Sequence, residues 1–208
     1  MRVLLVGDYP PPHGGISVHV ASLAEVLRRR GCEVRVLDVG RPPKATAPAG
    51  VAIARTRPQV ASEIFRAARQ GHLVHVHVSG HNAPSWSLAA VSTWLSRPFG
   101  PSLVTVHSGL APAYLARGPS RWAARLACAP ASRVICANED IQRSLRRCDL
   151  RPGRLETLPA FIDERSPLPP VPALFAALRS RSRRVLAIAL GEGPEYGRQL
   201  FLETLARL

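Results

Sequence analysis

The chain has 208 residues, of which 46% are hydrophobic and 20% charged, and its mean hydropathy is +0.02. This composition excludes an intrinsically disordered chain, and the sequence contains no run of about 18 apolar residues that would span a membrane. The net charge of +14 favours a polyanionic partner, namely nucleic acid, an anionic membrane or a phosphorylated substrate. At roughly 150 residues per domain, the length predicts one large domain, or one domain and a fragment.

The residue types behind this charge narrow the choice of partner. Lys44 is the single lysine, so almost all basic residues are arginines. They are dispersed rather than gathered into the dense basic tail of a nucleic-acid-binding arm.

The four cysteines form no CxxC pair, which favours reduced thiols over a zinc site or disulfides. The apolar opening, interrupted at Asp8, is too short for a signal peptide and indicates a cytoplasmic chain.

Seven short apolar runs alternate with helical patterns, which is typical of a parallel sheet covered by helices on both faces. We therefore expect a Rossmann-like α/β fold. The predicted strands are 2–7, 33–39, 51–55, 73–78, 102–107, 133–137 and 154–159.

Five helices are expected between these strands. The first covers 16–27 and ends at a capping Gly31, and the second begins with Pro58 at its first position. We predict that Phe65 faces inward on this second helix. The third covers 83–96, Ser120 caps the fourth, and Asn138 caps the fifth.

The composition changes after Phe161, where a stretch rich in Pro and Arg begins. We expect a domain over 1–163, a Pro- and Arg-rich linker over 164–183, and the first strand and helix of a second domain over 184–208. One strand and one helix cannot bury their own apolar faces, so the second domain is expected to be incomplete in this chain.

A glycine pair follows the first predicted strand and directly precedes a helix. Gly14 and Gly15 allow the backbone to approach a ligand closely, and the helix N-terminus offers N–H groups to a phosphate. The dinucleotide pattern GxGxxG is absent, which disfavours a nicotinamide-dependent enzyme. A plain strand–helix turn is the alternative interpretation.

Histidines cluster around the fourth and fifth strands. His75 and His77 share one face of a strand, and with His81 they resemble a metal-binding HxHxxxH pattern. The intervening residues supply no Asp, so we expect structural or substrate-facing histidines and no metal. His107 ends the next strand, at the rim where α/β sheets bind ligands, although an ordinary loop histidine is an alternative.

The stretch after His107 combines basic and aromatic residues. Arg121 and Arg125 share one helix face, and Trp122 and Leu126 form the adjacent apolar face. This pattern, together with Arg117, is typical of a helix lying on an anionic bilayer. The alternative is that Trp122 and Leu126 pack on the sheet while the arginines are solvated.

Taken together, these motifs resemble the N-terminal domain of a GT-B glycosyltransferase of the large retaining family-four type. The resemblance covers about residues 2–163. It rests on HGGIS with its helix, GCEVRVLD, VHVH followed by HNAPSWSLAA, LVTVHSG, and the closing run VICANEDIQRSLRRCDLRPGRLETLPAFID. In most members that run ends in a Pro-Asn-Gly-type turn, of which 159–162 is a variant.

The resemblance implies sugar transfer from a nucleotide-sugar donor to a glycan or lipid-linked acceptor, with no cofactor and no required metal. It places Gly15, beside Gly14, near the donor phosphates, and His107 near the donor sugar and diphosphate. The acceptor would lie around His13, His81 and Asn82.

The family's donor-binding basic and glutamate pairs lie further into the second domain than Leu208. The chain alone is therefore expected to be inactive, or to need a partner chain that supplies the second domain. A basic α/β protein that binds nucleic acid without catalysis is the alternative function.

Overall fold

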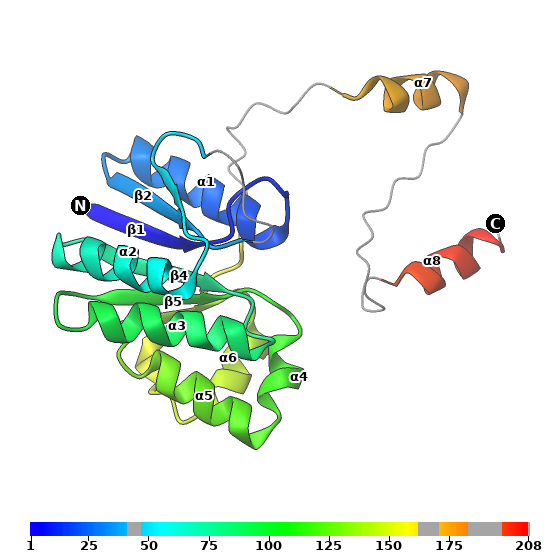
Figure 1. The fold of residues 1–208 in the computed structure, drawn as a ribbon. Coiled ribbons are helices and arrows are strands. Elements are labelled where there is room, and N and C mark those ends of the chain that lie inside the picture. The colour runs from blue at the N-terminus through cyan, green and yellow to red at the C-terminus, as the bar shows by residue number, and fades with distance from the viewer. Residues whose placement is uncertain (41–46, 162–170, 183–196, 208) are drawn as a thin grey trace. The chain divides into compact units, whose positions relative to one another are not determined.

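A computed structural model describes residues 1–40, 47–161, 171–182 and 197–207. The chain divides into two compact units, Met1–Glu164 and Arg165–Leu208, which are described separately (Figure 1). In the described ranges, no helix is long and apolar enough to cross a bilayer.

The described part of the larger unit is built on a seven-stranded sheet, in the order β3-β2-β1-β4-β5-β6-β7. Every neighbouring pair of strands is parallel. All seven predicted strands are confirmed. Their bounds are β1 (Arg2–Gly7), β2 (Glu33–Asp38), β3 (Val51–Ile53), β4 (Leu73–Val78), β5 (Ser102–Val106), β6 (Arg133–Cys136) and β7 (Leu155–Thr157).

Six helices and one short 3-10 turn connect these strands within the described residues. The five predicted helices are confirmed, and a five-residue helix that the sequence pattern did not indicate lies between the third and the fourth. The bounds are α1 (Gly15–Arg29), α2 (Arg57–Arg69), α3 (Ala83–Ser96), α4 (Ala111–Leu115), α5 (Gly118–Cys128), α6 (Glu139–Arg146) and η1 (Pro152–Arg154).

Two details of the helix predictions were wrong. Ser120 is a buried residue in the first turn of α5, where Arg117 is the N-cap. Phe65 is 43% exposed and packs edge-to-face on Phe99, because the buried stripe of α2 runs through Ile64, Ala67 and Ala68 and Phe65 lies beside it.

Two apolar layers cover the sheet, because alternate strand residues point to opposite faces. On one face, Val20 and Ala24 of α1 pack with Val3, Leu5 and Val36. On the other face, the larger core includes residues from α2, α3 and α5, and these three helices lie side by side (Figure 1). The sheet is therefore buried on both sides, as its uninterrupted apolar runs predicted.

The strand order reverses at β1, whose neighbours are β2 and β4. In open α/β sheets, ligands bind at such a switch point, beside the carboxyl ends of the strands. The loops that follow β1, β4 and β5 meet at this edge, so it is the place to look for a functional site.

The described residues of the second unit form two helices, α7 (Ala173–Arg181) and α8 (Arg198–Leu205). The helix α7 lies inside the stretch that was predicted as a linker. The predicted strand over 184–191 lies outside the described residues, and α8 falls in the stretch predicted as the following helix.

Candidate functional site

Three histidines from different elements meet at the switch point. His19 lies on α1, His77 on β4, and His107 directly follows β5. Nδ1 of His77 is 3.1 Å from Nε2 of His107, and the two rings stack with centroids 5.4 Å apart. The ring of His19 lies 4.9 Å from that of His107 and 5.5 Å from that of His77.

A fourth histidine supports this cluster from within the sheet. His75 shares a strand face with His77, as predicted, and their ring centroids are 4.2 Å apart. Nε2 of His75 is 2.7 Å from Oγ1 of Thr105 on β5. Gly7 ends β1 beside these rings, and a Cβ there would lie 3.1 Å from Cβ of His77. The small residue on β1 therefore leaves room for the imidazole on β4.

Burial keeps these rings uncharged. It lowers the pKa of His107 to about 4 and the pKa of His75 to about 3. It also lowers the pKa of His77 well below its ordinary value, and burial lowers the pKa of His19. At neutral pH the cluster therefore offers neutral N–H donors and nitrogen acceptors.

The three histidines of the HxHxxxH pattern, His75, His77 and His81, do not form a common site in the structure. His75 is bonded to Thr105, and His81 is an exposed loop residue. Among the described residues, the three-histidine group whose nitrogens lie within 4.8 Å of one another consists of His19, His77 and His107.

His19 and Phe161 are site residues that sequence reasoning missed. The amide of Phe161 donates to Nδ1 of His19 at 3.4 Å, and its ring packs edge-to-face on the imidazole at 5.0 Å. His19 lies within the apolar stripe of α1, so the pattern made it look like an ordinary core position. The available signal was a titratable residue on a helix face that must cover the strand of His75 and His77.

The glycine loop is held by side chains at both ends. Gly14 is the N-cap of α1, and its amide donates to Oγ of Ser17 at 2.8 Å. Ser17 in turn donates to the carbonyl of Pro12 at 2.8 Å. Gly14 and Gly15 are exposed, and a Cβ on Gly15 would meet nothing within 4 Å. Their predicted contact with donor phosphates stays a prediction.

A buried carboxylate fixes the start of this loop. Oδ1 of Asp38, at the end of β2, accepts hydrogen bonds from the amides of Tyr9 and Gly40, both at 3.0 Å. A nicotinamide site would use an acidic residue in this region for the ribose hydroxyls. In this chain Oδ1 of Asp38 accepts from two backbone amides, which holds the start of the glycine loop against the end of β2.

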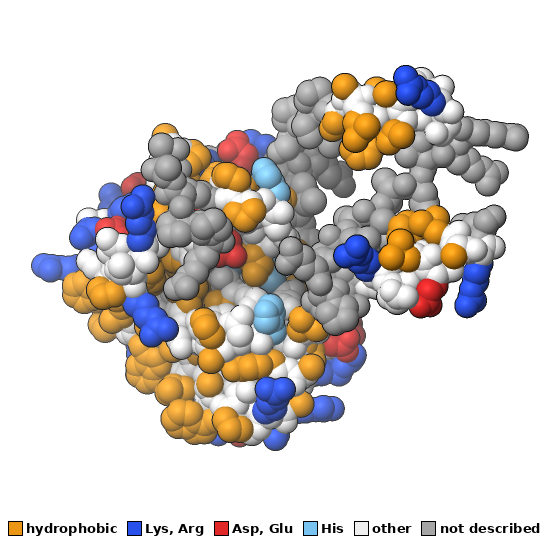
Figure 2. Space-filling view, turned by 45° about the vertical axis from the view of Figure 1, so that its right-hand side comes forward, with side chains coloured by type: hydrophobic (Ala, Val, Ile, Leu, Met, Phe, Trp, Pro, Cys, Tyr) orange, Lys and Arg blue, Asp and Glu red, His pale blue; other side chains and the backbone are white. Residues whose placement is uncertain are grey.

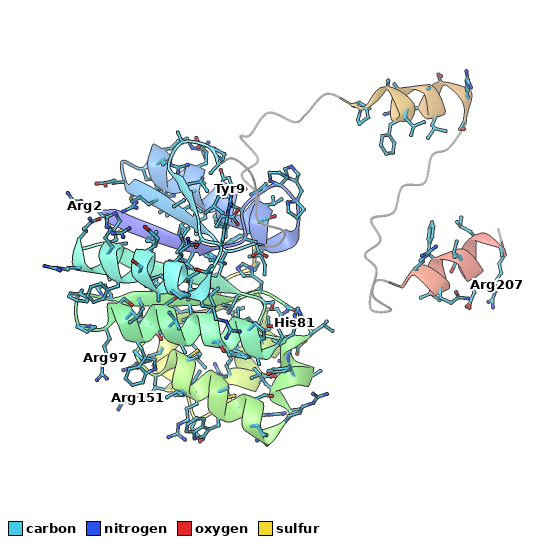
Figure 3. The ribbon with its side chains drawn as sticks, in the orientation of Figure 1. Arg2, Tyr9, His81, Arg97, Arg151 and Arg207 are labelled. Atoms are coloured by element: carbon cyan, nitrogen blue, oxygen red, sulfur yellow. The ribbon has the colours of Figure 1, made fainter. Side chains whose placement is uncertain are left out.

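The predicted acceptor residues lie at the same edge of the sheet. His13 and His81 are exposed, and Figure 3 shows His81 beyond the carboxyl ends of the strands, opposite Arg2. Asn82 is the N-cap of α3, where its Oδ1 accepts from the amide of Ser85 at 2.9 Å. The cap explains Asn82 without a ligand, and the acceptor role of all three residues stays a prediction.

A pocket of about 280 Å³ opens next to the loop that carries His107. The pocket is lined by Arg143 of α6 and by Arg147, which caps the C-terminus of that helix. The other lining residues are Gly109 of the β5–α4 loop, Pro112 of α4, the N-cap Asn138, and Asp140 and Ser144 of α6. Arg143 forms ion pairs with Asp140 and Glu139. The sequence pattern did not indicate this pocket, because its arginines look like the solvated face of a helix.

The residues predicted to face a membrane are exposed. Arg117, Arg121 and Arg125 reach solvent, and Trp122 is 67% exposed. The alternative in which Trp122 and Leu126 pack on the sheet is therefore wrong. Figure 2 shows hydrophobic and Lys or Arg side chains interspersed over the surface of the larger unit.

This exposed surface continues onto the neighbouring helix α3. Nε1 of Trp94 donates to the carbonyl of Leu126 at 3.1 Å, and both side chains are 41% exposed. The guanidinium of Arg97 lies 5.4 Å from the centroid of the Trp94 ring. We call Trp94, Arg97, Arg121, Trp122, Arg125 and Leu126 the aromatic–basic face.

Solved structures share this fold. HepE from Anabaena in complex with UDP and glucose is similar over 100% of this chain and 58% of its own, with a TM-score of 0.67 and 16% identity. Its complex with UDP-glucose gives a TM-score of 0.65 at 16% identity, over 100% of this chain and 57% of its own. UDP-GlcNAc 2-epimerase from Neisseria meningitidis bound to UDP-GlcNAc gives 0.51 at 12% identity, over 76% of this chain and 45% of its own.

At these identities the likeness shows the fold, a Rossmann-like domain like the N-terminal half of a GT-B glycosyltransferase. The chain spans 58% of the length of HepE. A comparison with curated protein sequences found no match. The sequence profile of Glycosyltransferase Family 4 matches residues 13–166, which is most of the chain. The chain therefore belongs to Glycosyltransferase Family 4.

Proposed function

We propose that the protein is a retaining glycosyltransferase that moves a sugar from a nucleotide-sugar to a glycan or lipid-linked acceptor. The family supports sugar transfer, and solved structures with this fold hold UDP and UDP-glucose. The product would belong to a cell-surface polysaccharide or a glycolipid. The reaction would need no metal or other cofactor.

The observation that carries this proposal is the neutral His107 at the switch point. In sugar transfer, positive charge develops on the sugar and negative charge on the departing diphosphate. A neutral imidazole N–H there can donate to the donor sugar or diphosphate without repelling the developing oxocarbenium ion. Gly15 is exposed at the first position of α1, and a Cβ there would meet nothing within 4 Å, which supports a phosphate contact at the start of this helix.

The acceptor would approach from the loops after β1 and β4, around His13, His81 and Asn82. These loops border the histidine cluster, so an acceptor hydroxyl there lies on the same edge as the donor sugar. The pocket lined by Arg143 and Arg147 is a further place for an anionic part of either substrate.

A lipid-linked acceptor would explain the aromatic–basic face. Exposed tryptophans beside arginines suit the interface of an anionic bilayer, where each arginine contributes about 1 kcal/mol. We therefore propose that the protein attaches peripherally to the cytoplasmic face of a membrane through this surface.

Nucleic-acid binding is the weaker candidate. Several arginines outside the aromatic–basic face are paired with carboxylates on the surface, including Arg2 with Glu33, Arg35 with Glu63 and Arg133 with Glu156. Such pairs reduce the cation density that phosphate backbones require. Tight DNA or RNA binding with a steep salt dependence would favour nucleic acid over sugar transfer.

The decisive experiment uses the full-length protein with a panel of nucleotide-sugars and lipid or glycan acceptors. Release of the nucleoside diphosphate reports transfer, and NMR of the anomeric centre reports retention or inversion. We expect transfer with retention from at least one donor. Failure of every donor and acceptor pair, with a folded protein, would overturn the proposal.

A further inference from the structure

The histidine cluster has the composition of a transition-metal site. One nitrogen from each of His19, His77 and His107 lies within 4.8 Å of the others. Nitrogens bound to one tetrahedral zinc ion at about 2.0–2.1 Å lie roughly 3.3–3.4 Å apart. The His77–His107 pair already has a separation of 3.1 Å, so small side-chain rotations of His19 would complete the set.

The cluster is also incomplete as a hydrogen-bond network. Nε2 of His77 is buried and has no hydrogen-bond partner. His77 itself is only 2% exposed, so solvent does not readily compensate for the missing partner. A metal shared with His107 would use the other nitrogen of His77, Nδ1, and no neighbour of Nε2 fixes which of the two nitrogens carries the hydrogen.

The chemistry of the three groups selects the kind of ion. All three are imidazoles, and the group contains no carboxylate. Imidazole nitrogens favour zinc, copper and nickel, whereas magnesium, calcium and manganese favour oxygen ligands. Three protein ligands leave a fourth tetrahedral position open, as in zinc sites that accept a small molecule.

We propose that His19, His77 and His107 form a three-imidazole site for a zinc ion, and that zinc bound there inhibits the protein. The inhibition rests on the proposed function, because zinc on His107 places a dication beside the sugar on which positive charge would develop. The metal site itself does not depend on that function.

Zinc binding has a structural consequence at Phe161. A neutral imidazole has a single lone-pair nitrogen, and in His19 this nitrogen accepts the amide hydrogen of Phe161 at 3.4 Å. A metal needs the same lone pair. Occupation of the site therefore releases the Phe161 amide from His19.

Binding is tested with the 208-residue chain freed of metal by a chelator. Zinc is titrated by calorimetry, and cobalt serves as a spectroscopic probe of a tetrahedral site. We expect one ion per chain. His19→Asn and His107→Asn should each weaken binding at least tenfold, whereas His72→Asn should leave it unchanged, because His72 is a buried histidine outside the cluster. Magnesium serves as the oxygen-preferring control and should not bind.

Three further measurements complete the test. Hydrogen exchange at the Phe161 amide should accelerate on zinc binding, and thermal unfolding of each variant shows whether it is folded. In the full-length protein, zinc should abolish sugar transfer and a chelator should restore it. The site would be overturned if zinc did not bind stoichiometrically. It would also be overturned if the folded His19→Asn and His107→Asn variants bound zinc as tightly as the unmodified chain. Binding without any effect on an active enzyme would overturn only the inhibition.

Discussion

His77 donates from Nδ1 to Nε2 of His107 in the tautomer that best fits their surroundings. The two atoms are 3.1 Å apart, and Nε2 of His77 is buried without a partner. A buried nitrogen lone pair is tolerated better than a buried unpaired N–H. His107 then accepts at Nε2 and carries its own hydrogen on Nδ1, which makes it a donor toward a ligand.

The first prediction concerns that donor. His107→Ala should lower the turnover of the full-length protein by a factor of roughly ten to a thousand, because a hydrogen-bond donor to the developing charge is lost. Steady-state kinetics measure the effect, and circular dichroism verifies the fold. His72→Asn is the matched control, since it removes a buried histidine outside the cluster. Unchanged turnover in His107→Ala would remove the residue from the mechanism.

The second prediction concerns pH and His75. Its pKa is about 3 in the folded protein and about 6.5 in an unfolded chain. The unfolded state therefore binds the extra proton as the pH falls below 6.5. The contribution of His75 is fully present above pH 6.5 and is lost toward pH 3, at about 1.4 kcal/mol per pH unit.

The variant His75→Gln tests this linkage. It removes the titrating group while leaving an amide that can bond Thr105. The unfolding free energy is measured with urea between pH 6 and pH 4. Its slope against pH should become shallower by about 1.4 kcal/mol per pH unit, which corresponds to about one proton fewer taken up on unfolding. An identical slope in the two proteins would show that His75 does not titrate on unfolding.

The third prediction concerns Gly80, which follows β4. It has a φ of 79°, and an added Cβ would lie 2.5 Å from Cγ1 of Val106. Gly80→Ala should therefore cost about 3 kcal/mol or more, through backbone strain and a clash in the core. Gly31→Ala is the matched control, because it has a φ of 77° but no atom within 4 Å of the added Cβ. It should cost only about 1 kcal/mol. Equal losses in urea unfolding would contradict the steric part of the argument.

The fourth prediction concerns membrane attachment. Arg121→Glu with Arg125→Glu should weaken binding to anionic vesicles at least tenfold, because both charges on the aromatic–basic face are reversed. Arg2→Glu with Arg133→Glu changes the net charge equally, at the amino ends of β1 and β6, and should have little effect. Co-sedimentation measures both. Equal binding to neutral vesicles would refute the electrostatic attachment.

The sequence predicted the sheet well, because buried parallel strands leave uninterrupted apolar runs that turns clearly separate. It missed α4 because five residues are too few to show a helical period. The misplaced Phe65 shows a different limit. An apolar side chain at the edge of a helical stripe can lie outside the core, because the helical period predicts the centre of the stripe, here Ile64 and Ala68, better than its width.

The candidate site was only half predictable. His107 and the face shared by His75 and His77 follow from the period of a strand. His19 and Phe161 are 142 residues apart, and their contact depends on how α1 lies over the sheet. Asp38 was missed for a similar reason, because its bonds to Tyr9 and Gly40 arise where two loops converge. Such juxtapositions have no local signature.

The contact between Phe161 and His19 joins two parts of the chain that lie 142 residues apart in the sequence. Phe161 gives both its amide and its ring to this contact, yet the residue is 42% exposed. A substitution at Phe161 therefore changes the surroundings of His19 from the protein surface, while the histidines and the buried core stay as they are.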